Sequence, residues 1–298
     1  MAPTMHPDEI ETDTALVRRL LAGQTPAWAD LAIERVRLVG TDNTLYRLGE
    51  DLVVRLPRRT RTAATLAKEV RWLPALAPLL PAPIPVPLAE GKPAEGFPFS
   101  WAVYPWLPGE RATTEVVVDR SRLATDLARF IRALQRIDTT GAPAPGEHNF
   151  GRGASLRTRD EPVRKALASV DGVAAGAVTA AWEAALGAPA WKRPPVWIHG
   201  DLDAQNILVA DGRLNGVIDF GGLGAGDPAA DVMVAWKLLD ADARSTFRDA
   251  LAVDDATWTR SRGWALSQAL IALDYYTQDT HPVLVREARR WIDTLLAE

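Results

Sequence analysis

The feature that most constrains this chain is a predicted hairpin near residue 211. Two apolar runs, 207–209 and 214–218, are separated by Asp211 and Gly212. An Asp-Gly pair between such runs predicts a tight β-hairpin, because both turn positions must tolerate a positive φ. The hairpin therefore brings the segments that flank it to one end of a single structural unit.

Three oxygen-bearing side chains flank this hairpin. Asp201 and Asn206 precede it, and Asp219 follows it directly. Two carboxylates and an amide at one end of a hairpin suit a hard cation, which prefers oxygen ligands. One carboxylate would then remain to handle a proton. The pattern predicts a metal site with a separate base.

Length and composition indicate an ordinary globular protein of two domains or lobes. The chain has 298 residues, of which 47% are hydrophobic and 24% charged, and this is enough apolar content for a core in each lobe. The absence of cysteine excludes disulfides, thiolate metal sites and a cysteine nucleophile. Residues 1–11 lack the apolar segment of a signal peptide, and no apolar run is long enough to span a membrane. We expect a cytoplasmic protein.

The charge is unevenly distributed along the chain. The net charge is −4, and no Lys/Arg stripe is present, so a nucleic-acid partner is not expected. Residues 199–298 contain 16 Asp/Glu and 9 Lys/Arg, a net of −7, which leaves +3 for residues 1–198. A basic front half favours a polyphosphate and an acidic back half favours a cationic small molecule. The alternative is scattered, solvated surface charge.

The first part of the chain predicts a small antiparallel sheet with helices. Helices are expected over residues 8–22 and 60–72, and Pro74 is expected to stop the second. The strands are expected at residues 33–39, 44–48, 52–56 and 97–106, with a proline-rich extended segment at 80–87 between the last two.

Two features of this sheet suggest a phosphate site. The turn at residues 40–43, with Thr41 and Asn43, can offer backbone N–H groups to a phosphate, and a plain β-turn is the alternative. Arg55 ends the third strand between apolar neighbours, where a charge is costly without a partner. Glu69 on the next helix is the expected partner and a phosphate the third member. Alternatively, Arg55 points to solvent from an edge strand.

The rest of the chain predicts a mostly helical lobe after a stiff connector. The run from Tyr104 to Gly109 contains two prolines and a glycine, which marks a lobe boundary. We therefore expect an N-terminal lobe over residues 1–104, a hinge over 105–110 and a C-terminal lobe over 111–298. Helices are expected at 120–137, 179–186, 228–239, 243–251, 255–274 and 282–296, with a Gly/Pro-rich loop at 139–153 and core tryptophans at Trp182, Trp236, Trp264 and Trp291.

The catalytic-type motif resembles that of a known family. His199-Gly-Asp-Leu-x-x-x-Asn206, followed by Ile218-Asp-Phe-Gly221, is similar to the H-R-D-L-x-x-x-N and D-F-G motifs of protein kinases. In the form with Gly after His it resembles the aminoglycoside phosphotransferase family. The resemblance covers nearly the whole chain. It implies an α+β, bilobal protein-kinase-like fold, with a small N-terminal antiparallel β-sheet lobe carrying one main helix and a larger, mostly helical C-terminal lobe.

The resemblance also implies roles for individual residues. Asp201 matches the catalytic base that deprotonates an acceptor hydroxyl, while Asn206 and Asp219 match Mg²⁺ ligands that bridge the phosphates of ATP. The loop itself would be supported by His199, Asp227 and Asp231. Asp203 stands where protein kinases usually have Lys, which argues against a protein substrate.

The nucleotide-binding residues depart from the family in one place. Arg55 stands where the family has Lys; it keeps the charge and can bind phosphate with two N–H groups. Its pairing with Glu69 matches the family's salt bridge. The resemblance further implies that the carbonyl of Pro105 and the N–H of Leu107 bind adenine. Thr41 and Asn43 would lie over the phosphates.

The leading hypothesis is an ATP- and Mg²⁺-dependent O-phosphotransferase acting on a small hydroxylated molecule, with antibiotic inactivation as its biological role. An aminoglycoside-type acceptor fits the acidic second half, whereas a macrolide or a metabolite such as choline, homoserine or a sugar is the alternative. Candidate acceptor contacts, each with surface or core as its alternative role, are Asp203, Asp274, Tyr275, Asp279, Asn149 and Arg152.

Two other classes of protein are alternatives. A nucleotide-binding pseudokinase is favoured only by Arg55, because Asp201, Asn206 and Asp219 are all present. A metal-dependent hydrolase would need more ligands than four histidines without i, i+4 spacing provide. Nothing in the sequence indicates whether the protein is a monomer or a dimer.

Overall fold

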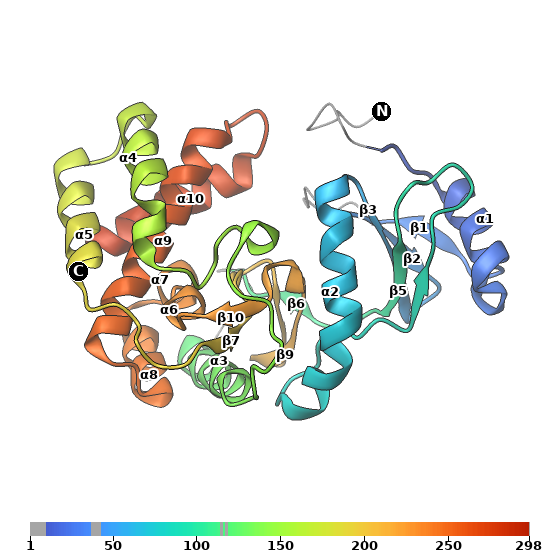
Figure 1. The fold of residues 1–298 in the computed structure, drawn as a ribbon, viewed down its shortest axis with the longest axis horizontal. Coiled ribbons are helices and arrows are strands. Elements are labelled where there is room, and N and C mark those ends of the chain that lie inside the picture. Colours follow the sequence, from blue (N-terminus) through green and yellow to red (C-terminus); the bar gives the residue numbers. More distant parts are fainter. Residues whose placement is uncertain (1–9, 37–42, 114–115, 117–118, 298) are drawn as a thin grey trace. The chain divides into compact units, whose positions relative to one another are not determined.

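A computed structural model describes residues 10–36, 43–113, 116 and 119–297 (Figure 1). The chain forms two compact units. The first comprises Met1–Pro108 together with Gly216–Gly221, and the second comprises Gly109–Asn215 together with Gly222–Glu298. The short segment after the hairpin, which contains Asp219, therefore belongs to the first unit although it is far from residues 1–108 in sequence.

The first unit contains a five-stranded antiparallel sheet. Its order is β1-β2-β3-β5-β4, which is one strand more than predicted, because β5 lies within the strand expected at residues 97–106 and β4 was not expected. The prediction missed β4, whose Ala-Glu-Gly sequence lacks the β-branched or aromatic residues that indicate strands. The strands are β1 (Ile33–Arg35), β2 (Asn43–Leu48), β3 (Leu52–Pro57), β4 (Ala89–Gly91) and β5 (Trp101–Pro105).

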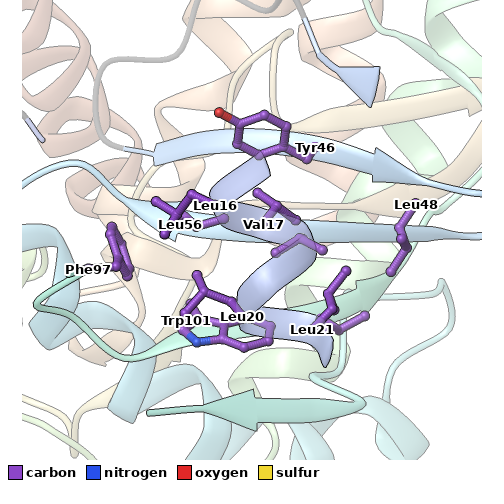
Figure 2. Close-up of a cluster of buried hydrophobic side chains, with 11 residues drawn as sticks. Leu16, Val17, Leu20, Leu21, Tyr46, Leu48, Leu56, Phe97 and Trp101 are labelled. Atoms are coloured by element: carbon purple, nitrogen blue, oxygen red, sulfur yellow. The ribbon is translucent and has the colours of Figure 1, made fainter. Parts of the chain in front are cut away.

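Helix α1 (Thr14–Gln24) covers this sheet with its apolar face. The helix begins later than the predicted residue 8 because Asp13 is its N-cap, and its carboxylate accepts a hydrogen bond from the N–H of Leu16 at 2.7 Å. Figure 2 shows α1 side chains packed against residues of the strands and of the segment before β5. The labelled members of this cluster are Leu16, Val17, Leu20, Leu21, Tyr46, Leu48, Leu56, Phe97 and Trp101.

Helix α2 (Thr60–Leu76) is longer than predicted. We expected Pro74 to end it, and this is wrong: Pro74 lies inside the last turn, and the N–H of Ala77 still donates to Leu73 O. A proline so close to the helix end removes one backbone hydrogen bond and little else. A short 3₁₀ turn, Ala77–Leu79, follows, before the proline-rich segment.

The second unit is mostly helical, with two small sheets. Strands β7 (Val196–Ile198) and β10 (Gly224–Gly226) pair with each other, and β6 (Glu110–Arg111), β8 (Ile207–Ala210) and β9 (Arg213–Val217) form the other sheet. The predicted hairpin joins β8 to β9 and is confirmed: Asp211 has φ 50° and Gly212 has φ 70°.

Apart from shifts of a few residues at helix ends, the helices of the second unit differ from the prediction in two places. Residues 228–239 form two short helices that meet at Met233 rather than one, and α4 was not predicted because Val163 and Ala166 alone make its apolar face. The predicted core tryptophans are all buried, at 5% exposed or less. The helices are α3 (Arg120–Gln135), α4 (Asp160–Ser169), α5 (Ala175–Gly187), α6 (Ala229–Val232), α7 (Val234–Leu238), α8 (Ala241–Leu251), α9 (Asp255–Tyr275) and α10 (Pro282–Leu296). None of these described helices combines the length and apolarity that a membrane crossing needs.

Candidate active site

The backbone before Asp201 is held by a buried carboxylate. Asp231, at the start of the α6–α7 segment, accepts hydrogen bonds from the N–H groups of His199 at 2.8 Å and Gly200 at 2.7 Å. Burial raises the pKa of Asp231, while His199 and these two N–H groups act in the opposite direction. His199 is itself fully buried, and its Nδ1 accepts the N–H of Asp201 at 3.2 Å. Asp231 and His199 together fix the path of the loop.

Gly200 is required by the geometry of this loop. Its φ is +81°, a region in which side chains are strained. A Cβ built on it would lie 2.4 Å from the carbonyl oxygen of Gly222. The backbone before Asp201 thus passes against the backbone before β10, which accounts physically for the Gly form of the motif.

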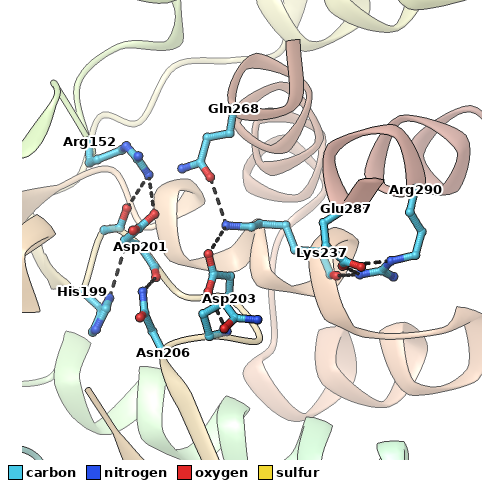
Figure 3. A network of polar contacts seen from close by, with 11 residues as sticks. Arg152, His199, Asp201, Asp203, Asn206, Lys237, Gln268, Glu287 and Arg290 are labelled. Carbon is cyan, nitrogen blue, oxygen red and sulfur yellow. Dashed lines mark hydrogen bonds and ion pairs between the residues drawn. The ribbon is translucent and has the colours of Figure 1, made fainter. Parts of the chain in front are cut away.

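Asp201 and Asn206 are linked within one loop. The Asn206 amide nitrogen donates to the backbone oxygen of Asp201 at 2.9 Å. The amide oxygen of Asn206 therefore faces away from that backbone oxygen. The Asp201 side chain is 41% exposed, and its Oδ1 lies 3.1 Å from Nη1 of Arg152 (Figure 3). The same Nη1 donates to Gly200 O at 2.7 Å. Arg152 was predicted as an acceptor contact. In the structure it holds the loop of residues 199–206, here called the catalytic-type loop, through Gly200 and Asp201.

Asp203 is engaged by the protein on both of its oxygens. Its Oδ1 accepts the N–H of Gln205 at 2.8 Å, and its Oδ2 lies 3.2 Å from Nζ of Lys237. Lys237 on α7 is 1% exposed and also donates to Oε1 of Gln268 on α9 at 3.0 Å (Figure 3). Its ammonium lies 4.5 Å from the ring centroid of Trp291. The ammonium group of Lys237 is thus buried between a carboxylate, an amide oxygen and an indole ring.

Asp227 forms a second buried ion pair in this unit. Its oxygens lie 2.6 Å from Nε and 3.0 Å from Nη2 of Arg260, and the two side chains are 6% and 4% exposed. Asp227 also accepts the N–H of Ala229 at 3.0 Å. Asp227 ties α9 to the segment after β10.

The first unit contains a compact charged cluster around Arg55. Its Nη1 lies 2.9 Å from both carboxylate oxygens of Glu69, so the predicted pair is present. Glu69 is fully buried and also accepts the hydroxyl of Tyr104 at 2.7 Å. Burial acts to lower the pKa of Arg55, but Glu69, Tyr104 and Asp219 outweigh it and raise that pKa above its ordinary value. Arg55 is therefore a permanent cation.

Asp219 is the exposed member of the same cluster. Its Oδ1 lies 3.6 Å from Nη2 of Arg55, and its side chain is 53% exposed. Its backbone has φ 62°, a conformation that Asp and Asn tolerate better than most residues. A half-exposed carboxylate beside a fixed guanidinium can bind a cation while the guanidinium binds phosphate oxygens.

Lys68 connects helix α2 to the segment that carries Asp219. Its Nζ donates to the carbonyl oxygen of Gly221 at 2.7 Å. Burial lowers its pKa from 10.5 to about 8, and Glu69 and Asp219 act in the opposite direction without cancelling that effect. Sequence reasoning missed Lys68, because an i, i+1 Lys-Glu pair on a helix has no distinctive spacing.

This lowered pKa predicts a pH-dependent stability. Between about pH 8 and 10.5 the unfolded chain holds a proton on Lys68 that the folded chain has lost, so the free energy of unfolding rises with pH in that window. Lys68→Met removes this contribution. In urea unfolding at pH 7, 8.5 and 10, wild type should gain stability relative to Lys68→Met as pH rises. A difference that stays constant with pH, or that also appears with the exposed-lysine control Lys92→Met, would contradict the assignment.

The other predicted nucleotide contacts are placed as follows. Pro105 is the last residue of β5 and lies opposite Leu52, and the next residue, Trp106, donates its N–H to Asp51 O at 2.6 Å. Leu107 follows outside regular structure. Asn43 begins β2, and its buried side-chain oxygen has no hydrogen-bond partner among the described residues. Thr41 lies outside the described residues.

The predicted acceptor contacts do not form one group. Asn149 is fully buried and shapes its own loop, accepting the N–H of Gly146 at 3.0 Å and donating to Arg152 O at 3.1 Å. Asp274 accepts the hydroxyl of Ser169. Tyr275 is 60% exposed, and Asp279 lies in the exposed turn after α9. Roles for these residues stay predictions.

Sequence reasoning missed Lys237, Gln268 and Tyr104. Lys237 had a signal, since a lone cation in the apolar run Val-Ala-Trp-Lys-Leu-Leu needs a buried partner. Gln268 and Tyr104 had none, because their partners lie far away in sequence.

A cavity of about 350 Å³ lies elsewhere in the second unit. The Gly/Pro-rich loop, the end of α5 and the segment before β7 line it, together with Asp227 and Arg260. Neither Asp201 nor Asn206 is among its lining residues. The size of a cavity is a weaker guide here than the chemistry of the loop, so the catalytic-type loop, and not this cavity, defines the candidate site.

The oxygen-bearing side chains of the candidate site suit Mg²⁺ shared with a substrate better than a metal ion bound by protein ligands alone. Among the residues that the structure describes, no three His, Cys, Asp or Glu side chains gather into a metal-binding group. Mg²⁺ is commonly bound by one or two carboxylates with substrate phosphates and water. The half-exposed carboxylate of Asp219 in the first unit and the amide oxygen of Asn206 in the second are each a ligand of this kind.

Solved structures with a similar fold indicate the class of protein to which this chain belongs. The chain is similar to the GDP and kanamycin complex of APH(2")-IIIa, with a TM-score of 0.72, 20% identity and coverage of 92% of this chain and 97% of that chain. It is also similar to macrolide 2'-phosphotransferase MphH from Brachybacterium faecium, with a TM-score of 0.64, 22% identity and coverage of 92% and 97%. The fold is that of the kinase-like antibiotic phosphotransferases.

The family follows from the sequence itself. A model of the phosphotransferase enzyme family matches residues 33–264, which is more than half of the chain. The chain therefore belongs to the phosphotransferase enzyme family, and the resemblance read from its motifs is confirmed. No curated protein matches the chain by sequence.

Proposed function

We propose that this protein transfers the γ-phosphoryl group of Mg-ATP to a hydroxyl group of a small molecule. The observation that carries the proposal is the Asp201–Asn206 loop, in which the amide nitrogen is bonded to the backbone of Asp201 at 2.9 Å. This contact keeps a carboxylate and an amide oxygen as separate groups, one for a proton and one for a metal. Family membership and the structural neighbours, which include GDP and ADP complexes of phosphotransferases, support it.

The chemistry requires one base and several positive charges. The acceptor oxygen forms a bond to the γ-phosphorus, the bond from that phosphorus to the β–γ bridging oxygen breaks, and ADP leaves. Oδ1 of Asp201 faces Arg152, so we assign Oδ2 to receive the hydroxyl proton. Mg²⁺ on Asn206 and Asp219 would neutralise charge on the phosphates. Asp231, His199 and Asp227 support the loop.

The first unit supplies the nucleotide-binding groups. Arg55, fixed by Glu69, offers the N–H groups of its guanidinium to phosphate oxygens in place of the family's lysine. Thr41, Asn43, Pro105 and Leu107 are the remaining proposed contacts. Because only a carbonyl is needed from Pro105, a proline is acceptable at that position.

The binding of Mg-ATP tests this proposal through Asp219. Wild type should show a rise in Tm with Mg-ATP, since a ligand that binds only the folded state at about 100 times its Kd adds about 2.7 kcal/mol of stability. Asp219→Asn removes the carboxylate charge but suits the positive φ of 62°. The Tm shift should shrink strongly in this variant.

The matched control is Asp211→Asn, because Asp211 also has a positive φ, at 50°, but lies in the hairpin turn. It should keep the full shift. A shift that survives Asp219→Asn, or one produced equally by Mg²⁺ without nucleotide, would contradict the nucleotide site. GTP in place of ATP, in the same assay, decides the preferred base.

The acceptor is proposed only as a hydroxylated small molecule. Antibiotic inactivation is the proposed biological role of the reaction. The structural neighbours include a kanamycin complex and macrolide phosphotransferases. An aminoglycoside-type acceptor is one candidate, suggested by the acidic second half, and macrolides or small metabolites are the alternative. A screen of these compounds for ADP release distinguishes them.

A further inference from the structure

Three carboxylates of the second unit, two of them in the loop of the proposed base, are paired with cations of the protein. Figure 3 shows three such pairs in the second unit. Asp201 lies 3.1 Å from Arg152, Asp203 lies 3.2 Å from Lys237, and a third pair on α10 joins Glu287 to Arg290 at 2.6 Å. Three carboxylates thus face three cations, and the net charge of the group is zero.

The central pair is built into the fold rather than placed on the surface. Lys237 is 1% exposed and Asp203 is 19% exposed. Arg290 donates to the carbonyl oxygen of Lys237 at 2.5 Å, which connects the central pair to the pair on α10. An ion pair with so little exposure is screened weakly by solvent and does not open easily to exchange partners.

This arrangement changes what the acidic second half can mean for the acceptor. The net of −7 over residues 199–298 favours a cationic acceptor only if carboxylates beside Asp201 are free to bind amines. Asp203, two residues from the base, instead has Lys237 on one oxygen and the N–H of Gln205 on the other. An amine brought to Asp203 meets the positive charge of Lys237 at the same carboxylate.

The hydrogen-bonding groups around Lys237 are donors as well. The Gln268 amide nitrogen and the Trp291 indole nitrogen are buried, and neither has a partner within the part of the chain that the structure describes. In Figure 3 the Gln268 amide nitrogen points away from Lys237, toward the side on which Arg152 lies. Both nitrogens are N–H donors, so neither supplies an acceptor for an ammonium group beside Lys237.

We infer that the acceptor of this enzyme is a hydroxylated molecule with at most one positive charge, and not a polycation. The inference rests on the proposed function, because it concerns the acceptor for Asp201. Lys237 acts as a specificity residue through Asp203: it cancels the charge that a polyamine would need.

The binding of kanamycin, a polyamine, to wild type and to Lys237→Met tests this inference by calorimetry. Wild type should bind it weakly, with little change between low and high salt. Lys237→Met keeps an unbranched side chain and leaves Asp203 unpaired, so its affinity for kanamycin should rise at least ten-fold and fall steeply with salt. Lys165→Met, which removes an exposed lysine of α4, should behave like wild type.

Two further variants keep the test decisive. Asp203→Asn combined with Lys237→Met should return kanamycin binding to the wild-type level, because the freed charge is gone. If Lys237→Met does not fold, Arg290→Met frees Glu287 in the more exposed pair and should give a smaller gain of the same sign. Tight, salt-sensitive binding of kanamycin to wild type, or no gain in the variants, overturns the inference.

Failure of this inference can be distinguished from failure of the proposed function, because calorimetry measures binding without phosphoryl transfer. Loss of Mg-ATP binding or of transfer would remove the proposed function alone. A panel of a neutral glycoside, a macrolide with a single amine and kanamycin, assayed for transfer, should rank kanamycin last in kcat/KM.

Discussion

Asp201→Asn is expected to lower kcat by about 10²–10⁴-fold, the range that a positioned general base contributes. The substitution keeps the size of the side chain and can keep a contact with Arg152, but it removes the group that receives the hydroxyl proton. KM for the nucleotide should stay close to the wild-type value, because the proposed nucleotide contacts belong to other residues. Steady-state ADP release with a competent acceptor measures both quantities.

Asp171→Asn, at an exposed position between α4 and α5, is the control and should leave kcat unchanged. Both proteins should have the same Tm, so that a loss of activity is not a loss of folded protein. Transfer that persists in Asp201→Asn within a few-fold of wild type would remove Asp201 from the chemistry. The basic group would then have to be sought elsewhere in the second unit.

Asp227→Asn is expected to lower the free energy of unfolding by about 3–5 kcal/mol, the cost of removing one partner of a buried ion pair. Arg260 would remain 4% exposed and without its counter-charge, although the new amide oxygen can still accept the N–H of Ala229. Since α9 and the segment after β10 are joined at this pair, urea unfolding should show a lower midpoint. The measurement is the unfolding free energy of purified protein without nucleotide.

The control for this change is Asp249→Asn on α8, where the carboxylate is exposed. Exposed substitutions of this kind change stability by about 0.5 kcal/mol or less. If Asp227→Asn unfolds at the same urea concentration as Asp249→Asn, the buried pair has no special weight. The structural role assigned to Asp227 would then be wrong.

Local signals explain which parts of the fold were predictable. The Asp211-Gly212 turn requires two positive φ values, and few residue pairs other than Asp-Gly and Asn-Gly supply them, so the hairpin could be placed from the sequence. Helix α2 shows the limit of such signals, because the effect of Pro74 depends on how many turns follow it. The break at Met233 depends on packing around buried residues and has no sequence marker.

The candidate site likewise contains contacts that could be predicted from the sequence and contacts that could not. Arg55 with Glu69 could be predicted, because a single charge in an apolar strand needs a partner and the next helix offers one. The contacts of Arg152 with Asp201 and of Lys237 with Asp203 span 49 and 34 residues. No spacing rule connects such positions. The sequence therefore indicated the reaction, while the neutralisation of the carboxylates around the base is a property of the folded chain.

Transfer of the γ-phosphoryl group of ATP to a hydroxyl oxygen of a small molecule can be tested on the reaction products themselves. The most direct measurement is mass spectrometry with phosphorus NMR on the products of the acceptor panel. We predict an acceptor that gains one phosphoryl group in a phosphate ester, in equal amount to the ADP formed, and no such product with Asp201→Asn. ADP formed only together with inorganic phosphate, with every acceptor unchanged, would contradict the claim.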